Sequence, residues 1–380
     1  RPLALVLPCL YSELEGEAIH LIVDELKEVR YIDQIILSMD RMDRRQFQHA
    51  AEFFSQLPQD LRIIWHDGPR MKALVEELEK SHLSIGEQGK GRGSWFAFGY
   101  AIGEGHAKAI AHHDCDIITY NRSLLARLCY PVVNAAMGYE YCKGYYARYR
   151  EQLFGRVTRL FVSPLLRALI KVTGGHPILD YLDSFRYPLA GEFAVTVDLA
   201  QTNRIPANWG LEIGMLTEVY RNASLKRICQ VDLVENYDHK HRTLSSKDPS
   251  KGLMKMSVDI ADSILRTLGT EGVPMGESFF RTLTTVYERS AEDTIKSYHD
   301  DALINQFEFD RHAESRAVET FRKALQIASR NYLDDPHGVV LIPNWNRVMA
   351  AIPDFLDRLQ ETVDADNEMV RSEVGLPAFR

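Results

Sequence analysis

The sequence predicts an α/β fold with a mixed, mostly parallel sheet, followed by a helical C-terminal region. Near the start, strands and helices alternate with short connections, which is typical of a parallel sheet covered by helices. The strands are continuous apolar runs, as expected of strands buried on both faces. These alternating elements are predicted over residues 3–7, 13–29, 32–38, 44–57, 61–65 and 71–83.

The middle of the chain predicts further strands, and the last third predicts helices almost alone. Strands are expected over residues 109–118, 139–148, 193–197 and 226–234, and helices over 95–102, 123–130 (ended by Pro131), 154–172 and 208–220. The later helices are expected over 261–268, 277–297, 312–332 and 345–363, with one strand-like run at 339–342 and a loose tail. We therefore expect one α/β domain over residues 1–259, in two halves over 1–121 and 122–259, and a helical extension over 260–380.

Composition narrows the classes of protein to which the chain can belong. Its hydrophobic fraction of 45% and charged fraction of 26% are those of an ordinary globular protein. The net charge of -8 argues against a nucleic-acid partner, since a phosphate-binding face is usually basic. No apolar run approaches the roughly 20 residues that span a bilayer. We therefore expect no membrane partner. The cysteines are scattered, without a CxxC pair, so we expect a reduced, cytoplasmic compartment.

The ends of the predicted strands carry polar or turn-forming residues. In α/β sheets, ligands bind outside the carboxyl ends of the strands, where Pro8, Asp40, Asp67 and Asp114 fall. Asp114 and Asp116 are two residues apart on an extended segment and therefore share a face. Two such carboxylates can hold a divalent cation, which in turn can bind a diphosphate. The alternative is a pair of solvated loop carboxylates.

Two cationic stretches are candidate anion sites. Residues 86–95 combine four glycines with Lys90 and Arg92 and then open a helix, where backbone N–H groups favour negative charge. The spacing is neither that of a Walker motif nor that of a dinucleotide-binding fingerprint, and a mobile surface loop is the alternative. Arg156 and Thr158 straddle another helix start, which suits a phosphate or a carboxylate. Helix capping with a solvated arginine would give the same pattern.

Two further positions have both a binding and a structural interpretation. Glu212 falls in the first turn of a predicted helix, where the dipole favours a carboxylate, or where it could bind a ligand hydroxyl. His239 and His241 are two residues apart in the loop that follows the strand predicted over 226–234. They are either potential metal ligands or solvated side chains.

In order, these blocks resemble the glucosyl-3-phosphoglycerate synthases, which are retaining glycosyltransferases of the GT-A fold, with mannosylglycerate synthases as more distant relatives. The resemblance covers about residues 3–242, and its specificity lies in three blocks that occur together. These are GRVT at 155–158, PLAGE at 188–192 and GLEIG at 210–214. The other matching blocks are LPCLYSE at 7–13, GKG at 89–91, DCD at 114–116 and HKHR at 239–242.

The resemblance implies transfer of glucose from a nucleotide sugar, GDP- or UDP-glucose, to 3-phosphoglycerate with Mg²⁺ or Mn²⁺. It assigns the nucleotide sugar to Pro8, Leu10, Ser12, Asp40, Lys90, Asp114, Cys115, Leu189, Ala190 and Glu212. It assigns the acceptor to Gly155, Arg156 and Thr158. It assigns the metal to Asp114, Asp116 and His239, with His241 as the alternative. Lys90, Asp116 and Glu212 are expected to act in catalysis, and the chain is expected to form a homodimer.

Other functions fit parts of the pattern. A related synthase could use mannose, or glycerate as its acceptor. A non-catalytic sugar-nucleotide-binding protein could share the fold, and a structural protein could depend on the helical third instead. Tyr11 and Ser12 stand where the family commonly has Asn and Glu, which leaves the preferred base open. No base or nucleophile stands out, and the resemblance implies front-face transfer in which a leaving phosphate oxygen accepts the proton.

Overall fold

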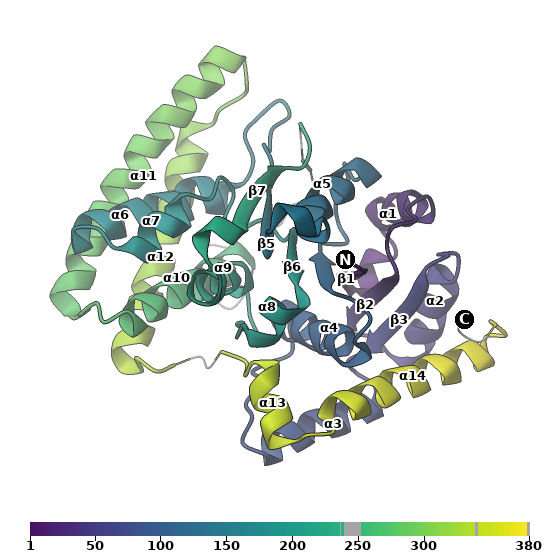
Figure 1. The fold of residues 1–380 in the computed structure, drawn as a ribbon. Helices are drawn as coiled ribbons and strands as arrows, with labels where there is room; N and C mark the ends of the chain where they lie inside the picture. Colours follow the sequence, from purple (N-terminus) through teal and green to yellow (C-terminus); the bar gives the residue numbers. More distant parts are fainter. Residues whose placement is uncertain (236, 239–251, 339–340, 378–380) are drawn as a thin grey trace.

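The protein is built on one seven-stranded mixed sheet with the strand order β3-β2-β1-β4-β6-β5-β7 (Figure 1). This computed structural model describes residues 1–235, 237–238, 252–338 and 341–377. Strands β1 to β4 run parallel, β6 is antiparallel to both β4 and β5, and β7 is parallel to β5. The strands are β1 (Leu3–Leu10), β2 (Gln34–Asp40), β3 (Asp60–Trp65), β4 (Ala109–His112), β5 (Tyr141–Tyr145), β6 (Phe193–Thr196) and β7 (Ile228–Asp232). The predicted mixed, mostly parallel sheet is confirmed.

Helices cover both faces of the sheet, so each central strand contributes to two hydrophobic cores. Along β1, Leu5 packs in the core that contains Ile22 of α1, whereas Val6 packs in the core that contains Phe96 of α4. Alternate side chains of a strand point to opposite faces, which explains the continuous apolar run in the sequence. The helices between the first strands are α1 (Glu17–Lys27), α2 (Arg44–Phe54), α3 (Pro69–Lys80) and α4 (Lys90–Glu104).

Helix α4 begins five residues before its predicted start, so the glycine-rich stretch is helical from Lys90 on, whereas residues 86–89 precede the helix. Gly91 and Gly93 are buried in the first turn of the helix. A Cβ on Gly91 would lie 2.0 Å from the carbonyl oxygen of Pro206, and only glycine lets the two backbones come this close. The glycines therefore serve close packing, and they fix Lys90 at the N-terminus of the helix.

The second half of the sheet is covered by shorter helices. Pro131 was predicted to end its helix, but α5 continues to Val133, because Pro131 costs one helix hydrogen bond while Val132 is fully buried beside it. The predicted helix over 154–172 begins as a π-helical segment (Val157–Val162) that leads into α6. The helices are α5 (Arg122–Val133), α6 (Ser163–Thr173), α7 (Pro177–Asp183), α8 (Val197–Thr202) and α9 (Leu211–Asn222).

The last third of the chain is helical, as predicted, but it packs in two places. Helices α10, α11 and α12 surround α6 and the π-helical segment, whereas α14 runs along α2, α3 and α4 on the other side of the molecule (Figure 1). The predicted helix over 345–363 is two helices, because Pro353 forces Ile352 out of the helical conformation. The helices are α10 (Gly252–Thr270), α11 (Glu277–Asn305), α12 (Arg311–Asp334), α13 (Trp345–Ala351) and α14 (Phe355–Glu373).

Helix α14 closes the outer edge of the sheet and extends through residues that were expected to form a loose tail. Its Asn367 accepts a hydrogen bond from the backbone N–H of Ile63 in β3 (2.9 Å) and donates one to the carbonyl of the same residue (2.7 Å). The side chain thus replaces a neighbouring strand at an otherwise open edge. Of the strand-like run at 339–342, residues 339 and 340 lie outside the described residues, and Ile342 forms one isolated bridge with Ile205. Among the described residues, no helix combines the length and apolar character needed to cross a bilayer.

Candidate active site

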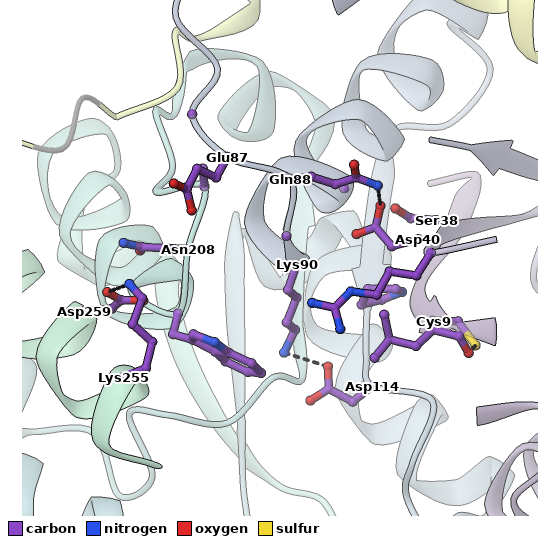
Figure 2. A pocket seen from close by; sticks show the side chains of 18 of the residues that line it. Cys9, Ser38, Asp40, Glu87, Gln88, Lys90, Asp114, Asn208, Lys255 and Asp259 are labelled. Carbon is purple, nitrogen blue, oxygen red and sulfur yellow. Dashed lines mark hydrogen bonds and ion pairs between the residues drawn. The ribbon is translucent and has the colours of Figure 1, made fainter. Parts of the chain in front are cut away.

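A cavity of about 1060 Å³ opens at the carboxyl ends of β1, β2 and β4. Pro8 and Leu10 line it from the end of β1, Asp40 from the end of β2, and Lys90 from the start of α4. Figure 2 shows Lys90 between these strand ends and the side of the cavity that α10 forms with Lys255 and Asp259. The predicted location of the ligand site at the strand ends therefore coincides with a cavity large enough for a nucleotide-sized molecule.

A second cavity of about 300 Å³ adjoins the first. Four residues line both cavities: Lys90, Asp114, Asp116 and Trp209. The walls of the smaller cavity come from the π-helical segment and from the PLAGE stretch, and they include Gly155, Arg156, Thr158, Leu189, Gly191 and Glu212. The acidic pair after β4 thus stands where two ligand-sized spaces meet.

Lys90 joins two carboxylates at this junction. Its Nζ lies 2.7 Å from Oδ1 of Asp114 and 2.9 Å from Oε1 of Glu212. Burial by itself lowers the pKa of Lys90, but the charges of Asp114 and Glu212 raise it above its ordinary value, so the ammonium stays charged. The Oε2 atom of Glu212 is buried and has no hydrogen-bond partner among the described residues. A ligand hydroxyl could satisfy this atom, because a buried carboxylate oxygen without a donor is costly.

The residues after β4 fit a divalent cation that prefers oxygen ligands. Asp114 and Asp116 are both partly buried and line the same two cavities. A Cβ on Gly191 would lie 2.6 Å from Oδ2 of Asp114, so the glycine makes room for the carboxylate beside the PLAGE stretch. Paired carboxylates are the donors that Mg²⁺ and Mn²⁺ prefer. The candidate third ligands, His239 and His241, lie outside the described residues.

The acceptor segment is held by contacts that its motif does not reveal. Gly155 has a φ of +73°, and a Cβ there would meet the hydroxyl of Tyr187 at 2.9 Å. Nε of Arg156 donates to Oε1 of Glu314 (2.8 Å), and Nη1 of Arg159 donates to Oε2 of the same carboxylate (2.9 Å). Oγ1 of Thr158 is buried without a hydrogen-bond partner among the described residues. Glu314 therefore fixes the Nε edge of Arg156, and Thr158 in the same segment keeps a hydroxyl without a partner among the described residues.

Two of the predicted site residues lie away from both cavities. Ser12 is exposed and lines neither space, whereas Glu13 of the same block lines the larger one. Ala190 is fully buried, and its carbonyl accepts a hydrogen bond from Nζ of Lys143 (2.6 Å). Cys115 lines the larger cavity but is only 2% exposed, because its thiol packs in the core beneath the nucleotide-sized space.

The chain is similar in sequence, over nearly its full length, to proteins of named function. It is 48% identical over 367 residues to the glucosyl-3-phosphoglycerate synthase of Persephonella marina, covering 97% of this chain and 91% of the relative. The chain belongs to the glucosyl-3-phosphoglycerate synthase family. It is also 41% identical over 372 residues to the synthase of Methanococcoides burtonii, covering 96% of this chain and 90% of that one. No protein-family model matches the chain.

Solved structures of the glucosyl-3-phosphoglycerate synthase family share this fold. The synthase of Mycobacterium tuberculosis, in complex with Mn²⁺, UDP-glucose and phosphoglyceric acid, superposes with a TM-score of 0.53 at 22% identity. The match covers 73% of this chain and 82% of that one, and it confirms the predicted fold class. Membership also confirms that the chain is a glycosyltransferase, which sets aside the two alternatives in which it is not an enzyme.

Sequence reasoning missed several residues of the site. Arg148 and Tyr187 line the smaller cavity, and Gln88 donates to Oδ1 of Asp40 (2.8 Å) in the larger one. Gln88 lies within the glycine-rich stretch 86–95, but that pattern points to its glycines and cations and not to an amide side chain. The aromatic stretch before Arg148 was interpreted only as a strand, and the helix that carries Glu314 was interpreted only as part of the helical extension.

Proposed function

We propose that this chain transfers glucose from UDP-glucose to the hydroxyl of 3-phosphoglycerate, with Mn²⁺ or Mg²⁺ bound by Asp114 and Asp116. The observation that carries the proposal is the junction of the two cavities at Lys90, Asp114 and Asp116. The larger space suits a nucleoside diphosphate and the smaller one suits a sugar and a small acid. Support also comes from the synthase of Mycobacterium tuberculosis, whose complexes contain Mn²⁺, UDP-glucose and phosphoglyceric acid.

The residues at the junction would stabilise the departing nucleotide. The bound cation would supply positive charge that offsets the diphosphate as it leaves. Lys90, whose Nζ lies 2.7 Å from Asp114, would supply a second positive charge to the departing diphosphate. Oε2 of Glu212 would accept a hydrogen bond from a hydroxyl of the sugar and so orient its anomeric carbon.

The acceptor would lie in the smaller cavity with its phosphate against the π-helical segment. The hydroxyl of Thr158 and the guanidinium of Arg156 would bind that phosphate. Glu314 would act as a positioning residue, because its carboxylate fixes the Nε edge of Arg156 and leaves the rest of the guanidinium for the ligand. The acceptor hydroxyl is thereby directed towards the junction with the larger cavity.

When the hydroxyl of 3-phosphoglycerate attacks the sugar, it loses a proton, and a group in this site must take that proton. No described histidine lines either cavity. His112 and His113 lie just before the acidic pair, but both are fully buried, and burial lowers their pKa values to about 3 and about 4. In the proposed reaction, an oxygen of the departing diphosphate takes this proton on the same face of the sugar, which retains the anomeric configuration.

A product screen tests the proposal. Purified chain would be incubated with UDP-glucose, GDP-glucose or GDP-mannose, with 3-phosphoglycerate or glycerate, and with Mn²⁺, Mg²⁺ or a chelator. We expect glucosyl-3-phosphoglycerate from UDP-glucose and 3-phosphoglycerate, detected by mass spectrometry, and no product with chelator. A higher rate with glycerate or GDP-mannose would replace the proposed substrates with those of a related synthase. Asp116→Asn, which removes one ligand charge at the junction, is the matched inactive control.

Three further proposals concern organisation. We propose a homodimer, for which light scattering of the purified chain is the test, and a cytoplasmic location, which the five free cysteines support.

We also propose that residues 1–121 and 122–259 form the nucleotide-sugar and acceptor halves of one domain. Residues 260–380 would form its helical extension. This extension would contribute to acceptor binding, because its Glu314 positions Arg156.

A further inference from the structure

The smaller cavity is lined by an arginine side chain that has no role in the proposed reaction. Arg148 follows β5 and lines this cavity together with Arg156 and Lys90. Lys90 is paired with Asp114 and Glu212, and Arg156 is paired with Glu314. Among the described residues, no carboxylate lies within ion-pair distance of Arg148. A partly buried arginine without a counter-ion is costly, so its place in a ligand cavity points to an anionic ligand group.

One edge of the Arg148 guanidinium has no hydrogen-bond partner among the described residues. Its Nη1 contacts the hydroxyl of Tyr187 at 3.4 Å, which is the one hydrogen bond of this guanidinium among the described residues. Its Nε is buried and has no partner there. Nε and Nη2 form the outer edge of a guanidinium, and two parallel N–H groups on one edge match the two oxygens of a carboxylate.

Tyr187 places Arg148 next to the acceptor segment. The Tyr187 hydroxyl that contacts Arg148 also lies 2.9 Å from the point that a Cβ on Gly155 would occupy. The ring of Tyr187 packs against Tyr146, with 4.8 Å between the ring centroids, and this contact fixes its position. Arg148 and the segment that starts at Gly155 therefore face the same small space from two sides.

The proposed acceptor carries an anionic group at each end, and the cavity offers two kinds of anion site. The start of the π-helical segment, with Thr158 and Arg156, presents several donors and suits the tetrahedral phosphate. We propose that Arg148 binds the carboxylate of the acceptor through its Nε and Nη2 atoms. Arg148 is then the residue that makes the site select a phosphorylated acid over a phosphorylated alcohol. This inference rests on the proposed function and names the group that determines its acceptor specificity.

The test compares 3-phosphoglycerate with glycerol 3-phosphate, which keeps the phosphate and lacks the carboxylate. Arg148→Gln is expected to lower kcat/KM for 3-phosphoglycerate by about 10- to 150-fold, the usual effect of losing hydrogen bonds to a charged group. The same variant should leave kcat/KM for glycerol 3-phosphate and KM for UDP-glucose unchanged. Arg148→Lys should recover only part of the loss, because an ammonium keeps the charge and lacks the planar edge. Arg322→Gln, which removes an arginine of α12 that pairs with Glu288 outside both cavities, is the matched control.

Calorimetry of the two acceptors separates this inference from the proposed function. In the wild-type chain with UDP and Mn²⁺, 3-phosphoglycerate should bind more tightly than glycerol 3-phosphate, and Arg148→Gln should remove that difference. Equal weakening of both acceptors would assign Arg148 to the phosphate or to folding and would overturn the inference. An unchanged preference in the variant would do the same. Failure of the wild-type chain to transfer glucose would reject the proposed function, while the binding comparison would still decide the role of Arg148.

Discussion

Replacing Glu212 with glutamine changes one oxygen of a buried carboxylate into an amide nitrogen while preserving its shape. In the native chain, Oε1 accepts from Lys90 at 2.9 Å and Oε2 has no protein donor among the described residues. The variant can keep the first contact through its carbonyl oxygen. At the second position it presents a donor instead of an acceptor, so a sugar hydroxyl can no longer donate there.

The expected loss follows from that single contact. A hydrogen bond to a charged group contributes about 1.5–3 kcal/mol, which corresponds to a fall of about 10- to 150-fold in kcat/KM. Lys90 keeps its partner Asp114 at 2.7 Å, so the diphosphate should still meet a charged ammonium. UDP, which lacks the sugar, should therefore bind the variant within about twofold of the wild-type affinity.

Initial rates with varied UDP-glucose, and calorimetry with UDP, measure the two quantities. Glu218→Gln is the matched control, because Glu218 lies on the same helix, is equally buried at 4% exposure and pairs with Arg221 outside both cavities. The control should lose some stability and keep its kcat/KM. The reasoning is refuted if Glu212→Gln retains kcat/KM within about threefold of wild type, or if it weakens UDP as much as UDP-glucose.

Three other substitutions probe different parts of the molecule. Gly191→Ala should weaken Mn²⁺ binding about 10- to 100-fold by calorimetry, because its Cβ would lie 2.6 Å from Oδ2 of Asp114. Glu314→Gln should raise KM for 3-phosphoglycerate, leave KM for UDP-glucose unchanged and cost about 1–3 kcal/mol of stability, because it removes the charge that pairs with Arg156 and Arg159. Burial raises the pKa of Asp262 from 3.8 to about 6, so its ionisation destabilises the folded chain as pH rises from about 4 to about 6. Asp262→Asn should therefore increase the unfolding free energy by about 2–3 kcal/mol above pH 6 and have little effect near pH 4.

Two of these substitutions have a control on the same chain. Gly276→Ala adds a Cβ in open space and should leave Mn²⁺ binding unchanged. Glu319→Gln changes an exposed residue of α12 and should alter neither KM nor stability. For Asp262, denaturant unfolding at several pH values is the measurement. Parallel pH profiles for the wild type and Asp262→Asn would contradict the raised pKa.

Local pattern was sufficient to predict the sheet and the acidic pair, because apolar runs and strand-end carboxylates are features of short segments. It was insufficient wherever a distant segment decides the outcome. The sequence at 90–93 allows either a loop or a helix, whereas in the structure these residues form the first turn of α4 and Gly91 lies against the carbonyl of Pro206. Glu314 reaches Arg156 across 158 positions of sequence, and no spacing rule predicts such a contact. Arg148 became a candidate only when Tyr187 and Gly155 were seen beside it.

The pairing of Asn367 of α14 with the edge of β3 affects the folding of the chain during its synthesis. Asn367, which satisfies the backbone of Ile63, lies 304 positions further along the chain. At about 5–20 residues per second, a ribosome needs roughly 15–60 seconds to add that stretch. During this interval the first strands can already pair, but β3 presents unsatisfied N–H and C=O groups to any neighbouring nascent chain. Until α14 has been made, β3 therefore lacks the side chain that satisfies the backbone of Ile63.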